Sequence, residues 1–99
     1  MLEAKYGYEW QFDPKTCRPK FEFARRMADG LVAEANRQIN AVRQLRMQLP
    51  NSAIYIKWHV SSENGARCIE SYLRDKIGNV IFNTFIEVIH TPAPPECNN

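Results

Sequence analysis

The residues at the start of the chain, Glu3, Ala4 and Lys5, have types and a spacing that could support phosphodiester chemistry. In a β-strand, the period of two places positions 3 and 5 on one face. The Glu3 carboxylate and the Ala4 carbonyl are hard oxygen donors of the kind that Mg²⁺ prefers, and a lysine beside such an ion could orient an attacking water. The spacing is typical of one half of a metal-dependent phosphodiesterase site.

The same three residues also have a plain structural interpretation, which is a surface strand that carries a mild charge pair. The chain contains eight Glu and five Lys among its 99 residues. A chance Glu-x-Lys is therefore expected about once in a few chains of this kind. From the spacing alone, the structural interpretation is favoured.

A second set of candidate residues is basic and belongs to the stretch 6–20, where four aromatic residues also occur. Arg18 and Lys20 could contact phosphates, and the neighbouring rings could stack on unpaired bases. Prolines and a glycine break this stretch and predict a loop, whose rings could instead pack on the core. Arg37, further along the chain, is either a third phosphate contact or a solvated helix residue.

Composition limits the class of protein. With 44% hydrophobic residues in 99, the chain is long enough for one small domain with one core. The formal charge of +2 permits a nucleic-acid partner without requiring one, although eight of the thirteen basic residues are Arg. No apolar run approaches the roughly 18 residues of a membrane span, so we expect no membrane span.

The three cysteines, Cys17, Cys68 and Cys97, are odd in number and widely spaced. They form no Cys-x-x-Cys or Cys/His pattern, which argues against a disulfide framework and against a zinc site. The cysteine pattern therefore favours a reducing compartment.

Residues 21–48 have the periodicity of one long amphipathic helix, ended by Pro50. On a helical projection these apolar residues share one face: Ala24, Ala28, Leu31, Ala35, Ile39, Val42 and Leu49. Gln38 lies at the margin of this face. It could direct its amide toward a catalytic edge of the sheet, or it could be an ordinary helix-flank residue in water.

Two further strands and a second helix follow. Residues 54–60 and 85–90 are rich in β-branched and aromatic residues, and we expect them to be neighbouring strands with Trp58 buried. Ser61 and Ser62 are candidate caps for a helix that ends at Gly78. Strands that alternate with helices predict an α/β domain over 1–91 with a mixed sheet flanked by helices. Residues 92–99 should form a flexible, proline-rich tail.

Four segments together resemble a known family: LEAK at 2–5, ANRQI at 35–39, WHV at 58–60 and IEVIHTP at 86–92. In this order they are similar to the restriction-endonuclease-fold toxins, in particular the fifth class of these domains, found among bacterial polymorphic toxins and type VI secretion effectors. The resemblance runs across nearly the whole chain. It implies a restriction-endonuclease-like fold of the PD-(D/E)xK superfamily.

The resemblance also implies roles for particular residues. Glu3 and Ala4 would bind Mg²⁺ or Mn²⁺, Lys5 would orient the attacking water, and Gln38 would border the catalytic site. The family's metal-binding Asp precedes the Glu-x-Lys strand, whereas only Met1 and Leu2 precede Glu3 here. We therefore expect a shortened domain that lacks its leading elements.

The function implied by the resemblance is that of an antibacterial DNase toxin. Such a protein would be made in the bacterial cytoplasm and secreted or injected, and it would act in the cytoplasm of a target cell. Its partners would be DNA, a cognate immunity protein and secretion-system or chaperone components. The alternative is a non-catalytic domain with the same fold that binds an immunity or secretion partner.

Overall fold

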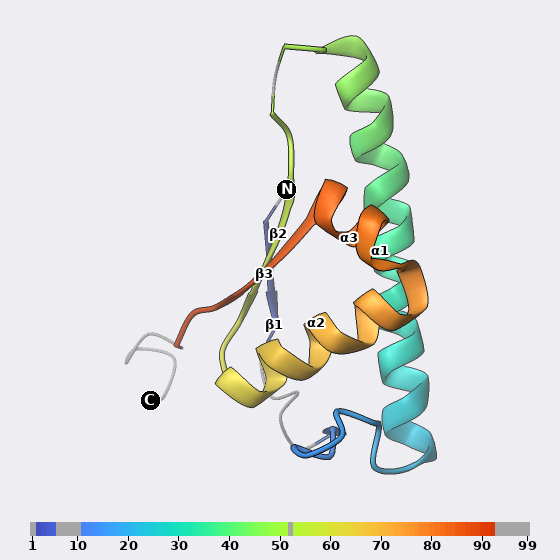
Figure 1. Cartoon of the computed structure of the whole chain (residues 1–99), viewed down its shortest axis with the longest axis vertical. Coiled ribbons are helices and arrows are strands. Elements are labelled where there is room, and N and C mark those ends of the chain that lie inside the picture. Colours follow the sequence, from blue (N-terminus) through green and yellow to red (C-terminus); the bar gives the residue numbers. More distant parts are fainter. Residues whose placement is uncertain (1, 6–10, 52, 93–99) are drawn as a thin grey trace.

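The computed structural model describes residues 2–5, 11–51 and 53–92, which form an α/β fold (Figure 1). The elements are, in chain order, β1 (Leu2–Lys5), α1 (Glu22–Gln48), β2 (Ile56–Val60), α2 (Glu63–Ile77), α3 (Asn79–Phe85) and β3 (Ile86–His90). The described strands form one sheet in the order β1-β2-β3, and both neighbouring pairs are parallel. The predicted α/β class, with helices beside a sheet, is confirmed.

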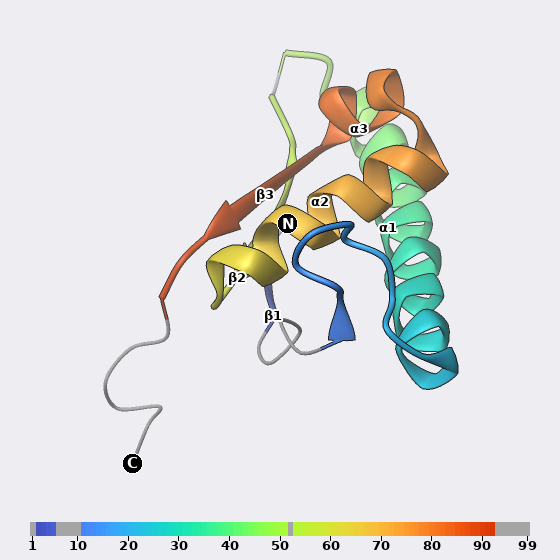
Figure 2. The same cartoon turned by 60° about the horizontal axis from the view of Figure 1, so that its bottom comes forward.

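The helices pack on one face of this sheet. Figures 1 and 2 show α2 lying between the strands and α1. In β2 the alternate residues Ile56, Trp58 and Val60 are buried, whereas Lys57 is exposed, as expected for a strand covered on one face only. Trp58 has no exposed surface, so its predicted burial is confirmed.

Helix α1 follows the predicted apolar stripe. Its buried residues are Ala24, Ala28, Leu31, Ala35, Ile39 and Val42. Leu49, which was expected on the same face, is 50% exposed. It lies beyond Gln48, the last helical residue, so the helical projection no longer fixes the direction of its side chain.

Arg46 fastens the end of α1 to two later segments. Its Nε and Nη2 donate to the Ile54 carbonyl at 3.0 and 2.7 Å, and Nη2 also donates to the Thr84 carbonyl at 2.8 Å. The guanidinium lies over the rings of Tyr55 and Phe85, 5.0 and 4.6 Å from their centroids. One side chain thus joins α1 to the segment that precedes β2 and to the end of α3.

The second helix begins at the predicted cap, because the Ser62 Oγ accepts from the Gly65 N–H at 2.8 Å. It ends at Gly78, whose φ of 100° lies in a region that glycine adopts at low cost. The chain then enters α3, a seven-residue helix that was not predicted from the sequence. Phe82 and Phe85 anchor α3 in the core, 2% and 6% exposed.

The segment 11–21 is an ordered loop, and it corrects the expectation about cysteines. Cys17 and Cys68 form a disulfide, with Cα atoms 4.7 Å apart, that ties this loop to α2. The prediction that the cysteines do not pair is therefore wrong. The two residues are 51 positions apart, and such a pairing becomes visible only once the fold brings the loop onto α2. Because these two cysteines pair, the cysteine pattern no longer favours a reducing compartment.

Candidate functional site

The predicted catalytic strand is an edge strand of the sheet. β1 pairs with β2 so that Glu3 aligns with Trp58, Ala4 with His59 and Lys5 with Val60. Positions 3 and 5 therefore stand at the level of two buried residues of the central strand. Ligands of open α/β sheets bind beyond the carboxyl ends of the strands, and Lys5 is the last residue of β1.

Gln38 is brought to the same level of the sheet from α1. The Trp58 Nε1–H donates to the Gln38 Oε1 at 2.8 Å, and the Gln38 side chain is half-buried. Because Trp58 is the register partner of Glu3, the chain places Gln38 one strand away from position 3. Gln38 thus points at the sheet and not into water; its catalytic role remains a prediction.

The three predicted phosphate contacts do not form one patch. Arg18 and Lys20 belong to the 11–21 loop, and both are exposed. Arg37 is also exposed but lies fifteen residues into α1 from Glu22, which is roughly 22 Å along the helix axis. A nucleic acid that contacts all three would have to extend along α1.

The two histidines lie near the carboxyl ends of β2 and β3. The half-buried His59 hydrogen-bonds through Nδ1 to the Thr91 Oγ1 at 2.9 Å, while the Thr91 N–H donates to the Val60 carbonyl at 2.8 Å. His90 is exposed. His59 aligns with Ala4, between the register partners of Glu3 and Lys5. His59 is one of the β2 residues that alternate with the buried residues Ile56, Trp58 and Val60.

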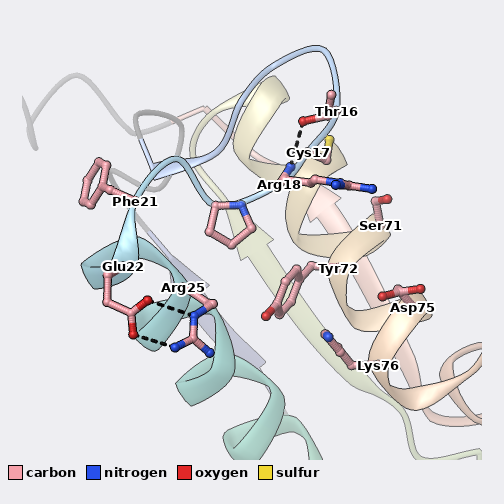
Figure 3. A pocket seen from close by; sticks show the side chains of 11 residues that line it. Thr16, Cys17, Arg18, Phe21, Glu22, Arg25, Ser71, Tyr72, Asp75 and Lys76 are labelled. Atoms are coloured by element: carbon pink, nitrogen blue, oxygen red, sulfur yellow. Dashed lines mark hydrogen bonds and ion pairs between the residues drawn. The ribbon is translucent and has the colours of Figure 1, made fainter.

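A hollow in the structure is separate from this strand site. It has a volume of about 610 Å³ and lies between the 16–21 segment, the first turn of α1 and the second half of α2 (Figure 3). α2 contributes Ser71, Tyr72, Asp75 and Lys76. The volume falls in the range of roughly 300–1,000 Å³ that is usual for ligand pockets.

Fixed hydrogen bonds and ion pairs build one wall of this hollow. The Tyr72 hydroxyl donates to the Asp29 Oδ1 at 2.6 Å, and Arg25 lies 3.6 Å from Asp29 Oδ2. Arg25 also pairs with Glu22 at 2.5 Å, which holds the pKa of the Glu22 carboxyl below its usual value. The charges of Arg25, Glu22 and Asp29 are thus largely satisfied by one another.

The hydrogen bond from Tyr72 to Asp29 in this wall can be tested by the pH dependence of the protein's stability. Burial, the hydrogen bond to Asp29 and the charge of Asp29 raise the pKa of Tyr72 from 10.0 to about 12. The uncharged phenol therefore favours the folded state below pH 10, and this contribution is lost as the pH rises toward 12. Urea unfolding between pH 9 and 12 should show a fall in stability that is shallower in Tyr72→Phe. Identical slopes in the two proteins would contradict the assignment.

The hollow was not predicted from the sequence, although the sequence contains one signal of it. Ser71 and Asp75 are four residues apart in a predicted helix, which places both on one polar face. Nothing in the sequence indicated that Tyr72 would bond Asp29, 43 residues earlier.

Metal ligands are sparse in the part of the chain that the structure describes. Those residues contain no group of three or more His, Cys, Asp or Glu side chains that could hold a metal ion. No helix among them is long and apolar enough to cross a membrane.

Comparisons with known proteins add no family. No protein-family model matches the chain, and neither curated proteins nor solved structures give a match.

Proposed function

We propose that this chain is the metal-dependent nuclease domain of a restriction-endonuclease-fold toxin, and that it hydrolyses phosphodiester bonds of DNA. One observation carries the proposal. The sheet register aligns Glu3 with Trp58, and the Trp58 indole is hydrogen-bonded to Gln38 at 2.8 Å. Glu3 and Gln38 are 35 positions apart in the sequence, and the register and this hydrogen bond place both at one level of the sheet.

The oxygen donors of Glu3 and Ala4 are of the type that a hard cation prefers. Glu3 and Ala4 would hold Mg²⁺ or Mn²⁺ with a carboxylate and a carbonyl oxygen, and Mg²⁺ commonly keeps several waters and uses one or two carboxylates with substrate phosphates. When bound, the ion would neutralise charge on the scissile phosphate and lower the pKa of a bound water. One carboxylate makes a weak site, so we expect little Mg²⁺ affinity without DNA.

The other two residues would act on the substrate and the water. The Lys5 ammonium would hold the attacking water and stabilise its hydroxide form. Gln38 uses its Oε1 to fix the Trp58 indole, and an amide that accepts through oxygen keeps donor hydrogens for a second partner. Gln38 would therefore position a phosphate oxygen or water at the margin of the site.

The test is a nicking assay on supercoiled plasmid with Mg²⁺ or Mn²⁺, with EDTA as the metal-free reference. Glu3→Ala and Lys5→Ala should each lower the rate by roughly a hundredfold or more. Calorimetry with Mn²⁺ and DNA should separate them, because Glu3→Ala removes a metal ligand whereas Lys5→Ala leaves the ligands in place.

The sheet offers matched controls. Lys57 and Glu87 are exposed and aligned with each other in β2 and β3, so Lys57→Ala and Glu87→Ala remove the same charges from neighbouring strands. Both controls should retain the wild-type rate. Nicking that persists in EDTA, or at the wild-type rate in Glu3→Ala, would show that the site is not catalytic.

A second function is favoured by exposed apolar side chains at the beginning of α1. Phe21, the N-cap residue of α1, is 44% exposed, and Phe23 and Met27, in the first two turns of this helix, are 56% and 36% exposed. Apolar groups gathered in this way are typical of a protein-binding surface. If no nuclease activity is found with any metal, a non-catalytic domain that binds an immunity or secretion partner becomes the better interpretation.

A further inference from the structure

We propose that the hollow between the 16–21 segment, α1 and α2 binds a single unpaired nucleotide of a nucleic-acid strand. The proposal extends the proposed nuclease function by giving the chain a second, non-catalytic contact with its substrate. The hollow is remote from the strand site, because Arg25 and Gln38 are thirteen residues apart on α1, which is roughly 20 Å.

The hollow is held open by contacts that do not depend on a ligand. The Cys17–Cys68 disulfide fixes its loop wall to α2, and Arg67 donates through Nη2 to the Pro14 carbonyl. Within the loop, Phe12 and Pro19 form an antiparallel bridge, and the Asp13 N–H donates to the Arg18 carbonyl at 2.8 Å. A preformed wall lowers the ordering cost of binding.

Two cations in the hollow are available for an anionic group. The Arg18 guanidinium makes no hydrogen bond or ion pair with another described residue, and Figure 3 shows it reaching from the loop toward Ser71. The Lys76 Nζ lies 5.5 Å from the centroid of the Tyr72 ring and has no acidic partner within the described ranges. Arginine with nearby hydroxyls is a common arrangement for phosphate.

One carboxylate in the hollow, that of Asp75, favours a nucleotide over a simple phosphate as the ligand. Asp75 forms no ion pair with the residues that the structure describes, and it lines the same hollow as Arg18 and Ser71. It would repel a second phosphate and accept a hydrogen bond from a sugar hydroxyl or a base amine. Pro19 and Tyr72 supply apolar surface for the ring. A mononucleotide unit offers all three features: one phosphate, donor groups and a ring face.

The position of the hollow suits a strand that passes the proposed catalytic edge. In Figure 1 the 11–21 loop lies at the lower end of the molecule, the end toward which β1 and β2 run. A strand bound at the carboxyl ends of the sheet could therefore place a nearby nucleotide in the hollow.

The experiment measures binding of a 5′-phosphorylated six-nucleotide DNA, labelled at its 3′ end, by fluorescence polarisation in EDTA. Arg18→Gln should weaken binding about tenfold and reduce the salt slope by about 0.7, the value for one phosphate contact of a single strand. The matched control is Arg43→Gln, an exposed arginine on α1 outside the hollow, which should change affinity less than twofold. A nucleoside monophosphate should compete better than inorganic phosphate, and Asp75→Asn should reduce this difference.

Several results would overturn the proposal. Equal weakening by Arg18→Gln and Arg43→Gln would indicate diffuse attraction, and equal competition by an acidic peptide would indicate a protein ligand. Binding without saturation would exclude a site. Because the assay contains no metal and measures no cleavage, its outcome is independent of the nicking assay: failure of Glu3 and Lys5 to support cleavage leaves this binding test intact.

Discussion

Reducing the Cys17–Cys68 disulfide is expected to lower the free energy of unfolding by about 4 kcal/mol. The bond closes a loop of 51 residues, and the chain-entropy relation assigns this amount to a loop of that length because the cross-link restricts the unfolded chain. For a domain of this size the loss is a large share of a total stability of roughly 5–15 kcal/mol. Urea unfolding with and without a phosphine reductant measures it directly.

The measurement is best made on a Cys97→Ser background, which removes the third thiol and prevents exchange between alternative pairs. The oxidised and reduced proteins then differ only in the Cys17–Cys68 bond. Cys17→Ala with Cys68→Ala should resemble the reduced protein and should no longer respond to the reductant. A reduced protein as stable as the oxidised one would mean that the bond does not form in solution or does not constrain the unfolded chain.

Replacing Trp58 with Ala is expected to cost about 3–5 kcal/mol, the usual range for deleting a large buried aromatic side chain. Trp58 is fully buried at the centre of the middle strand, where β1 and β3 flank it at Glu3 and Val88. Chemical denaturation followed by far-UV circular dichroism measures the effect without relying on the tryptophan signal. A loss below 1 kcal/mol would contradict the central placement of this residue.

A double-mutant cycle with Gln38 isolates the polar part of this interaction. Gln38→Leu removes the acceptor of a buried indole N–H, which should cost about 1–3 kcal/mol. In a Trp58→Phe background the same change should cost much less, because no N–H remains to be satisfied. Gln44→Leu, at an exposed position of the same helix, is the control and should be nearly neutral.

The regular elements could be predicted because each has a local signal. The apolar stripe of α1 recurs from Ala24 to Val42, the helix ends shortly before Pro50, and Ser62 marks the start of α2. The alternation of residue types in β2 correctly placed Trp58 and Lys57 on opposite faces of the strand. In each case neighbouring residues within a few positions carry the information.

The elements that escaped prediction depend on distant contacts. α3 has the sequence NVIFNTF, which favours neither helix nor strand clearly, and it is held by the packing of Phe82 and Phe85. The pairing of Cys17 with Cys68, the Arg46 contacts and the hollow beside Tyr72 all join segments that only the fold brings together.

The candidate site shows the same division. The position of Gln38 at the margin of the apolar face indicated that it could approach the sheet, but its partner Trp58 could not be identified from spacing. Arg18 and Arg37 were alike in the sequence as exposed arginines. The structure separates them, because one lines a preformed hollow and the other does not.

The disulfide also determines what happens to the molecule when a protease cuts the backbone between Cys17 and Cys68. With Cys17 joined to Cys68, the chain between them, which includes α1 and β2, is a covalent ring, while β1 and β3 emerge from its two sides. Leu49, Pro50 and Asn51, in the exposed connection between α1 and β2, belong to this ring. A protease that cuts there opens the ring but leaves one molecule, with both outer strands still attached to the central one. Only when the bond is reduced do the halves become separate chains, so a nicked protein could persist under oxidising conditions and come apart under reducing ones.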